Sequence, residues 1–207
     1  MTAQIAIKAE GLKKVFNRRV VFEGVSFSLA PTQTLLISGR NGSGKSTLVK
    51  IVAGVLSPTA GSVSISGPSE GGYFGHQALI GMVSPYLQMY EEFSAEENLL
   101  YASTIRGEAY DQTRAHELLR RVALYARKDD PVRTYSSGMK QRIKYAFALL
   151  HRPPILLLDE PMANLDADGI AIVREIMQEH RRNGAVLVAT NDLTDVDVYD
   201  KRITLDA

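Results

Sequence analysis

The chain has 207 residues, of which 45% are hydrophobic and 23% are charged, and it carries a formal net charge of +1 with no cysteine. This length and composition are typical of a globular protein with a substantial buried core. A net charge this close to zero provides no basic surface field, so we expect no nucleic-acid partner. The lack of cysteine excludes disulfides and thiolate metal sites.

Membrane association is expected only through another chain. The longest apolar runs, such as residues 155–158, are far too short to span a bilayer. The first residues also lack the basic and apolar regions of a secretion signal. If the protein works at a membrane, a different subunit has to hold it there.

The first third of the chain predicts short strands separated by polar turns, at residues 5–9, 20–29 and 34–38. In the second of these, Val25, Phe27 and Leu29 alternate with serines, which indicates a half-buried antiparallel strand. A helix follows, and its apolar face is predicted to contain Leu48, Ile51, Val52 and Val55. Another short alternating strand is predicted at residues 61–67.

The rest of the chain predicts a helical block and then a return to alternating strands and helices. Residues 86–150 have a mostly helical pattern, in which Ser94 and Glu97 form a capping box. The later elements are a strand at 155–158, a helix at 170–182, and strands at 185–189 and 202–205. This alternation predicts an α/β fold with a parallel sheet covered on both faces, into which the helical block is inserted.

A glycine-rich loop between a predicted strand and a predicted helix carries the Walker A pattern, Gly, any four residues, then Gly-Lys-Ser. The glycines allow successive N–H groups to point at phosphate oxygens, and the following helix adds its positive end. Lys45 would contact the β- and γ-phosphates, and Ser46 would bind Mg²⁺. A chance glycine turn is the alternative, which the strand-loop-helix context disfavours. The predicted nucleotide-binding residues are Gly39, Asn41, Gly42, Ser43, Gly44, Lys45, Ser46 and Thr47.

Two carboxylates, Asp159 and Glu160, follow directly on the apolar strand at residues 155–158. In open α/β sheets the carboxyl ends of the strands face the ligand crevice. Asp159 would hold Mg²⁺, and Glu160 would polarise the attacking water as a general base. The alternative is a strand that ends in a solvated acidic turn.

With these motifs in place, residues 135–142 make the chain resemble the ABC ATPase family. They read Tyr-Ser-Ser-Gly-Met-Lys-Gln-Arg, where the family signature usually reads Leu-Ser-Gly-Gly-Gln before basic and glutamine residues. The resemblance implies one ABC ATPase domain over residues 1–207. Its expected fold is a P-loop NTPase (RecA-like) core with an N-terminal antiparallel β-subdomain and a helical subdomain inserted at about 86–150.

The same resemblance implies that ATP is bound between two subunits. Ser136 and the Gly138 backbone, at a helix N-terminus, would clamp ATP held by a second copy in a head-to-tail homodimer. A plain serine-glycine helix cap is the alternative. Residues 163–166 resemble the D-loop, so Asp166 is expected to contact the nucleotide site across the dimer. Phe16 falls where the family stacks an aromatic on adenine, although an aromatic in a strand is also a common core residue.

Two positions depart from the family pattern. Pro85 falls where the family has its lid glutamine, and we expect Gln88 to reach Mg²⁺ or the attacking water instead, with a surface glutamine as the alternative. Asn191 replaces the usual switch histidine. An asparagine amide still donates a hydrogen bond to the γ-phosphate but cannot become a cation. Our hypothesis is therefore an ATPase that is active but slow.

Histidine-based metal binding is not expected. The four histidines have no paired spacing with acidic residues, and we expect them at solvated positions: His76, His116, His151 and His180.

The resemblance implies an ATP- and Mg²⁺-dependent ATPase that powers export through a separate integral membrane permease, on the cytoplasmic face of the membrane. The signature variant is most similar to exporter ATPases, among them the small ATPases of haem export in cytochrome c maturation. Aromatic and methionine residues between 86 and 93 suit a groove for a helix of the permease, or else a packed hinge. The alternatives are a soluble ABC ATPase of the iron–sulfur assembly type and an ATP-gated dimerising adaptor with little hydrolysis.

Overall fold

The computed structural model describes residues 6–66 and 75–205, which form two β-sheets and a set of helices. The smaller sheet is antiparallel, with the order β2-β1-β4, and consists of β1 (Ala6–Phe16), β2 (Arg19–Leu29) and β4 (Ala60–Ser66). The larger sheet is parallel, with the order β5-β6-β7-β3-β8, and consists of β3 (Thr34–Gly39), β5 (Ile80–Val83), β6 (Ile155–Asp159), β7 (Ala185–Thr190) and β8 (Lys201–Leu205).

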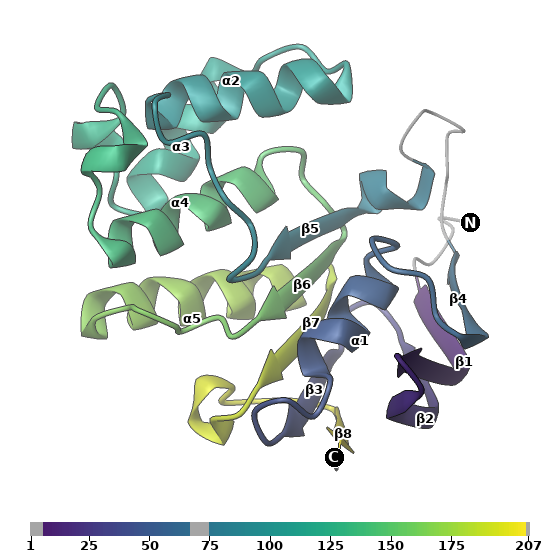
Figure 1. The fold of residues 1–207 in the computed structure, drawn as a ribbon. Coiled ribbons are helices and arrows are strands. Elements are labelled where there is room, and N and C mark those ends of the chain that lie inside the picture. Colours follow the sequence, from purple (N-terminus) through teal and green to yellow (C-terminus); the bar gives the residue numbers. More distant parts are fainter. Residues whose placement is uncertain (1–5, 67–74, 206–207) are drawn as a thin grey trace.

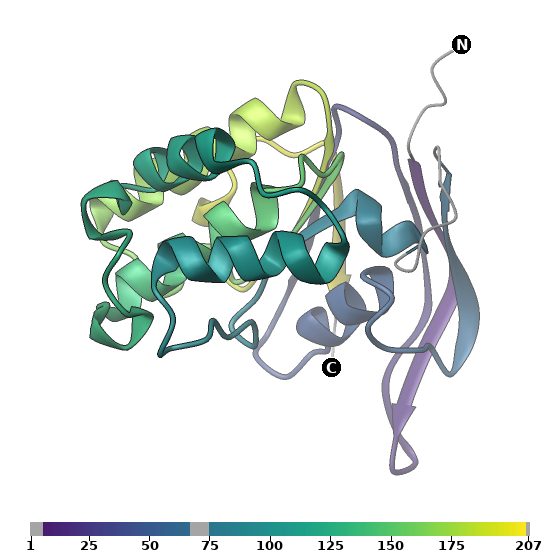
Figure 2. The ribbon, with the colours of Figure 1, turned by 90° about the horizontal axis from the view of Figure 1, so that it is seen from above.

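The helices divide between the two faces of the parallel sheet. They are α1 (Lys45–Val52), α2 (Ala95–Arg106), α3 (Gln112–Arg121), α4 (Ser137–Leu149) and α5 (Ala167–Arg181). Figure 1 shows α2 to α5 on one side of the sheet, and α1 with the antiparallel sheet on the other. The view from above in Figure 2 separates the same two halves. Because α2, α3 and α4 lie between β5 and β6 in the chain, they form the predicted helical insertion.

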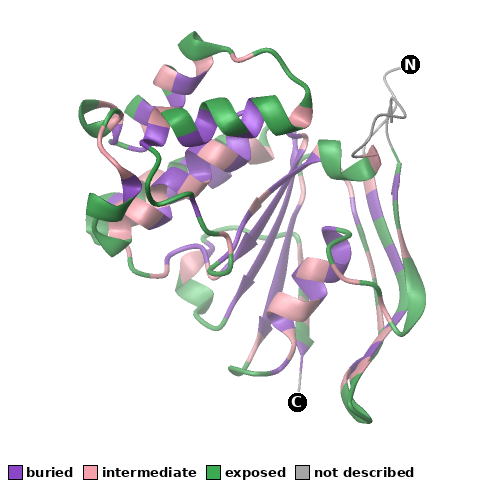
Figure 3. Ribbon diagram, turned by 45° about the horizontal axis from the view of Figure 1, so that its top comes forward, coloured by how far each residue is buried: buried purple, intermediate pink, exposed green. Residues whose placement is uncertain are grey.

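The core consists of two apolar clusters separated by the parallel sheet. Successive strand residues point to opposite faces, so Leu156 and Leu158 pack with the helical insertion and α5, while Ile155 and Leu157 pack with α1 and the antiparallel sheet. Figure 3 shows the central parallel strands as buried, and β6 and β7 are buried at every residue, whereas the edge strand β8 is partly exposed. A sheet covered on both faces needs apolar residues in succession, which confirms the fold class predicted from the sequence.

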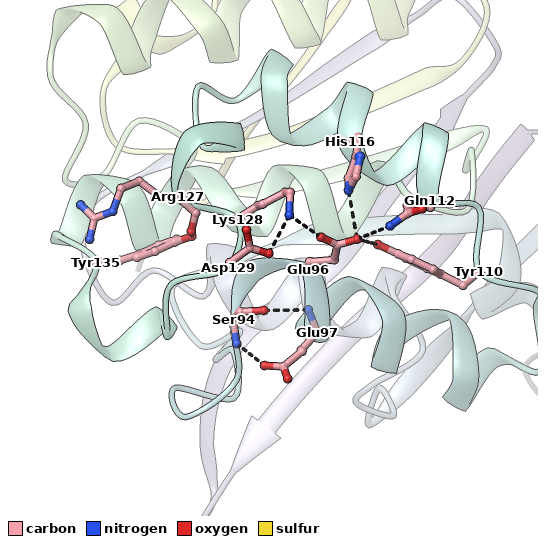
Figure 4. Close-up of polar contacts among 10 residues, drawn as sticks. All are labelled: Ser94, Glu96, Glu97, Tyr110, Gln112, His116, Arg127, Lys128, Asp129 and Tyr135. Carbon is pink, nitrogen blue, oxygen red and sulfur yellow. Dashed lines mark hydrogen bonds and ion pairs between the residues drawn. The ribbon is translucent and has the colours of Figure 1, made fainter.

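The helical insertion is tied together around the first turn of α2. Ser94 and Glu97 form the predicted capping box, with Ser94 Oγ 3.1 Å from Glu97 N and Glu97 Oε2 2.7 Å from Ser94 N. Between them in the chain, the Glu96 carboxylate contacts four side chains from later segments, as Figure 4 shows: Tyr110 at 3.4 Å, Gln112 at 2.9 Å, His116 at 3.0 Å and Lys128 at 3.1 Å. We call these five residues the Glu96 cluster.

The Glu96 cluster holds a carboxylate in its charged form. Burial alone raises the pKa of the Glu96 carboxyl, but the hydrogen bonds from Gln112, Lys128 and His116 outweigh burial and lower this pKa to about 2. The cluster therefore stabilises the packing of α2 against α3 through an ionised group.

The structure corrects several predicted elements. β1 continues to Phe16, well beyond the predicted strand at 5–9. Residue 5 of that prediction, and residue 67 of the predicted strand at 61–67, lie outside the described part of the chain. The helix predicted at 170–182 begins earlier, at Ala167. Val55 is not on the buried face of α1, because α1 ends before Gly54 (φ 70°) and the Val55 side chain is 67% exposed.

The expectation of solvated histidines is wrong for three of the four. Only His76 is exposed, whereas His116, His151 and His180 are half-buried. Burial lowers the pKa of His151 to about 4. In the described ranges, no group of three or more His, Asp or Glu side chains is placed to hold a metal ion.

None of the helices in the described ranges combines the length and the apolar character that a membrane crossing requires.

Candidate functional site

The predicted Walker residues and Asn191 meet at the carboxyl edge of the parallel sheet. Asp159 ends β6, Asn191 follows β7, the loop at residues 40–44 connects β3 to α1, and Ser84 follows β5. The strands β5, β6, β7 and β3 are neighbours in that order, so these four ends lie side by side. This is the edge at which open α/β sheets bind ligands.

The glycine-rich loop has a backbone that few other residues tolerate. Gly42 and Gly44 have φ angles of 83° and 99°, and a Cβ on Gly44 would lie 2.5 Å from Cγ1 of Val21. Gly44 also forms the N-cap of α1 without a side chain that could accept from the first turn. The N–H groups at this end of α1 therefore suit an anionic ligand such as a phosphate.

The Lys45 side chain lies between this loop and the acidic pair. Its Nζ donates to the carbonyl oxygens of Gly39 (2.9 Å) and Arg40 (3.2 Å), and lies 3.6 Å from Oε1 of Glu160. The side chain is only 5% exposed. A buried ammonium at the mouth of a phosphate loop has the position and the charge to contact phosphate oxygens.

Asp159 is the centre of a group of oxygen atoms. Ser46 Oγ donates to Oδ1 at 2.9 Å, and Ser84 Oγ donates to Oδ2 at 3.3 Å. The carboxylate is fully buried, and burial raises the pKa of Asp159 while the two hydroxyl donors oppose that rise. A hydroxyl and a carboxylate are ligands that Mg²⁺ favours, so Ser46 and Asp159 fit this ion. Ser84 was not predicted from the sequence.

The Glu160 side chain points from an unusual backbone toward Lys45. Its φ of 49° is uncommon for a residue other than glycine, and its N–H donates to the Ala189 carbonyl at 2.8 Å. Oε2 lies 3.4 Å from the Thr190 hydroxyl. Backbone conformations of this kind concentrate at functional sites, where neighbouring structure holds them.

The structure brings Asn191 to the phosphate loop but leaves Gln88 apart from Asp159. Asn191 Nδ2 donates to Oδ1 of Asn41 at 3.0 Å, so the amide can face a phosphate bound in the loop. Gln88 is exposed and, within the described residues, makes no hydrogen bond to Asp159. It lines a cavity of about 220 Å³ together with Pro85, Leu87, Met89, Glu91, Val132, Lys140 and Lys144. The role assigned to Gln88 remains a prediction.

Phe16 lies at the exposed end of β1. Its side chain is 46% exposed, so the alternative that it belongs to the core is wrong. Lys14 Nζ lies 4.7 Å from the centre of the ring. An exposed aromatic face remains available for stacking on a base, as the family resemblance implies.

The signature and the D-loop lie together, away from the phosphate loop of the same chain. Ser136 caps α4 and accepts from Met139 N at 3.3 Å, while Asp166 caps α5 and accepts from Gly169 N at 2.8 Å. A Cβ on Gly138 would lie 3.1 Å from the Asn164 carbonyl oxygen. Figure 1 shows α4 and α1 on opposite sides of the sheet. Contact with nucleotide stays a prediction for Ser136, Gly138 and Asp166. In this structure these residues lie at the N-terminal ends of α4 and α5.

Comparisons with known proteins agree with this geometry. Residues 22–163 match the family model described as ABC transporter. The cytochrome c biogenesis ATP-binding export protein CcmA of Methylococcus capsulatus is 36% identical over 187 residues, 88% of this chain and 89% of that protein. A solved ATP-binding subunit of an ABC transporter is 27% identical, with a TM-score of 0.82 over 96% of this chain and 85% of that one. The dimeric bacterial ABC transporter cassette MJ0796 has the same fold, with a TM-score of 0.86 at 22% identity over 97% and 94% of the two chains. The chain therefore belongs to the ABC transporter family, with the fold and the motifs of its ATP-binding cassette.

Proposed function

We propose that the chain is the ATP-hydrolysing subunit of an exporter and acts as one ATPase domain over residues 1–207. The observation that carries this proposal is the hydroxyl–carboxylate pair of Ser46 and Asp159, beside the buried ammonium of Lys45. Phosphate-binding backbone, an ammonium and a site for a hard cation are the parts that phosphoryl transfer from ATP requires.

Each site residue has a defined part in hydrolysis. Lys45 and the loop N–H groups bind the phosphates, and Ser46 with Asp159 would hold Mg²⁺, which neutralises charge on the phosphate oxygens. Glu160 orients water and accepts its proton while the water oxygen bonds to the γ-phosphorus and the bond to the β–γ bridging oxygen breaks. Asn191 donates a hydrogen bond to the γ-phosphate.

The site is completed by a second copy of the chain. Ser136 is the N-cap of α4, and α4 lies on the opposite side of the parallel sheet from α1, which supports a contact with the nucleotide of another molecule rather than with that of the same chain. The dimeric cassette noted above supports this arrangement by its shared fold. A head-to-tail pair related by a twofold axis gives two equal sites.

A membrane permease is the proposed partner, docked at an apolar cavity of about 420 Å³ between the helical insertion and the core. Its apolar lining includes Met82, Tyr86, Leu87, Ile105 and Phe147. Beside it, Tyr90, Phe93 and Tyr101 form a mutually packed aromatic group that is partly exposed. An apolar groove with aromatic walls suits a short helix of the permease, which would place the chain on the cytoplasmic face of the membrane. Because the chain is similar to the cytochrome c biogenesis export protein, haem is the first cargo to test.

The proposal is tested by phosphate release from ATP with and without Mg²⁺. We expect Mg²⁺-dependent release by the wild type, loss of nucleotide binding in Lys45→Ala, and retained binding without turnover in Glu160→Gln. Undiminished ATP binding by Lys45→Ala would contradict the site. Tight binding by the wild type without any phosphate release would favour the ATP-gated adaptor instead. Co-purification with an integral membrane protein distinguishes an exporter subunit from a soluble ABC ATPase.

A further inference from the structure

The Ser84 hydroxyl and the Ser84 carbonyl oxygen each have two hydrogen-bond partners, and one of these four partners comes from a distant element. Its hydroxyl donates to Asp159 and accepts from Tyr86 N at 3.3 Å. Its carbonyl oxygen accepts from Leu87 N at 3.1 Å and from Lys144 Nζ at 3.1 Å. The residue is only 2% exposed, so water does not substitute for these partners. Three of the four contacts come from the sheet edge and the turn around Ser84, and Lys144 alone comes from the helical insertion.

Lys144 is an unusual residue to place at this point. It is half-buried on α4, and burial lowers its pKa. Among the described residues it forms no ion pair, and the Ser84 carbonyl is its one hydrogen-bond acceptor. A partly desolvated ammonium without a carboxylate partner is a poor choice for stability alone. The neighbouring tie between α4 and this segment, Lys140 to Glu91 at 2.6 Å, is by contrast an exposed ion pair.

We propose that Lys144 is a positioning residue for the magnesium site, holding the Ser84 main chain so that the Ser84 hydroxyl stays on Asp159. This inference rests on the proposed function, because it assumes that Ser46 and Asp159 hold Mg²⁺. The bond to the carbonyl ties the backbone of Ser84 to α4, while the hydroxyl of the same residue contacts Asp159. Without it, only the bonds from Tyr86 N and Leu87 N hold the turn at residues 84–87, and we expect the hydroxyl to leave the carboxylate more readily.

The position of Lys144 on α4 gives this contact a second consequence. The same rigid helix has the signature serine, Ser136, as its N-cap and carries Lys144 about two turns further on. Any movement of α4 as a rigid body would therefore move both Ser136 and the group that holds Ser84.

The test measures the Mg²⁺ dependence of nucleotide binding rather than turnover. In Lys144→Met, the half-saturating Mg²⁺ concentration for binding of a fluorescent ATP analogue is expected to rise roughly fivefold, the effect of losing one hydrogen bond. Affinity for the analogue in EDTA is expected to stay at the wild-type value. Lys144→Arg keeps a donor and is expected to restore most of the Mg²⁺ affinity. Glu91→Gln, which breaks the neighbouring tie to α4, is the matched control and is expected to leave both values unchanged.

A double-mutant cycle separates positioning from a general effect on folding. If Lys144 acts through Ser84, then Lys144→Met has less than about a twofold effect on the Mg²⁺ midpoint when Ser84→Ala is already present. Full additivity of the two changes, or a wild-type midpoint in Lys144→Met, overturns the inference. A wild type that shows no Mg²⁺-dependent binding of the analogue overturns the proposed function itself, and the two failures are therefore distinguishable.

Discussion

Replacing Glu96 with glutamine should weaken the helical insertion by removing the charge at the centre of the Glu96 cluster. In Glu96→Gln the amide oxygen can still accept from Tyr110, Gln112 and His116, which all contact Oε1 in the wild type. The amide nitrogen would then replace Oε2 and face the Lys128 ammonium, 3.1 Å away, donor against donor. The variant therefore loses its charged contact while the shape of the side chain is kept.

The size of the loss follows from the pKa of Glu96. Its value falls from 4.5 to about 2, a difference of 2.5 units. At 1.36 kcal/mol per unit this sets an upper bound of about 3 kcal/mol, and partial solvent screening of the side chain, which is 18% exposed, reduces the expected loss to about 2 kcal/mol. Because the folded pKa is lowered, the stabilisation is complete above about pH 4.5 and disappears as the pH falls from there toward 2.

Urea unfolding followed by circular dichroism measures this loss. At pH 7 we expect Glu96→Gln to unfold at a clearly lower urea concentration than the wild type, and at pH 3.5 we expect the gap to narrow. Glu117→Gln, an exposed carboxylate on α3 outside the cluster, is the control and should change the free energy of unfolding by less than about 0.5 kcal/mol. Equal midpoints for Glu96→Gln and Glu117→Gln at pH 7, or a gap that does not change with pH, would refute this reasoning.

Three further substitutions test the site and the core. Asn191→Ala should lower the rate of phosphate release by about 10²-fold, because it removes a donor that acts on transition-state charge, and unchanged turnover would exclude Asn191 as the γ-phosphate sensor. Phe16→Ala should weaken binding of a fluorescent ATP analogue by about tenfold through the loss of stacking, and an unaltered affinity would place adenine elsewhere. Tyr145→Phe should lower the free energy of unfolding by about 1–3 kcal/mol, because the fully buried hydroxyl donates to the Pro161 carbonyl at 2.8 Å, and calorimetry that finds no loss of stability would contradict this cost.

The phosphate loop and the acidic pair were predictable because their chemistry is written in consecutive residues. The loop needs glycine where φ is positive, and Gly42 and Gly44 supply it at the expected spacing. Asp159 follows an apolar run whose length already indicates a buried strand. In both places a short stretch of consecutive residues is sufficient to predict the chemistry, because that stretch itself supplies the functional groups.

Ser84 was missed because its role depends on the pairing of distant strands. Val83 of β5 is opposite Leu158 of β6, so Ser84, which follows β5, comes to lie beside Asp159, the last residue of β6. β5 has only four residues and includes Gly81, so no alternation reveals it. Lys144 likewise gains its meaning only once α4 is packed against this edge.

The errors on Val55 and the histidines have a similar cause. A helical periodicity continues through Val55, but the chain turns away from the helix at Gly54, so the periodicity outlasts the helix. We expected His151 and His180 at solvated positions because they lack the paired spacing with acidic residues that a metal site needs, yet packing onto the sheet leaves both side chains half-buried. The spacing of histidines and acidic residues in the sequence does not predict whether an imidazole ring is buried.

The alternation of residues along β6 also decides how tolerant this edge is to insertion or deletion. Asp159 has the same parity as Ile155 and Leu157, the residues that face α1, and this parity directs its carboxylate to Ser46. Deleting one leucine from this strand would move the Asp159 side chain to the opposite face of the sheet. The carboxylate would then lie in the apolar cluster beneath α4 and α5, where no cation or hydroxyl contacts it. A deletion of one residue within the strand is therefore expected to impair folding and metal binding together.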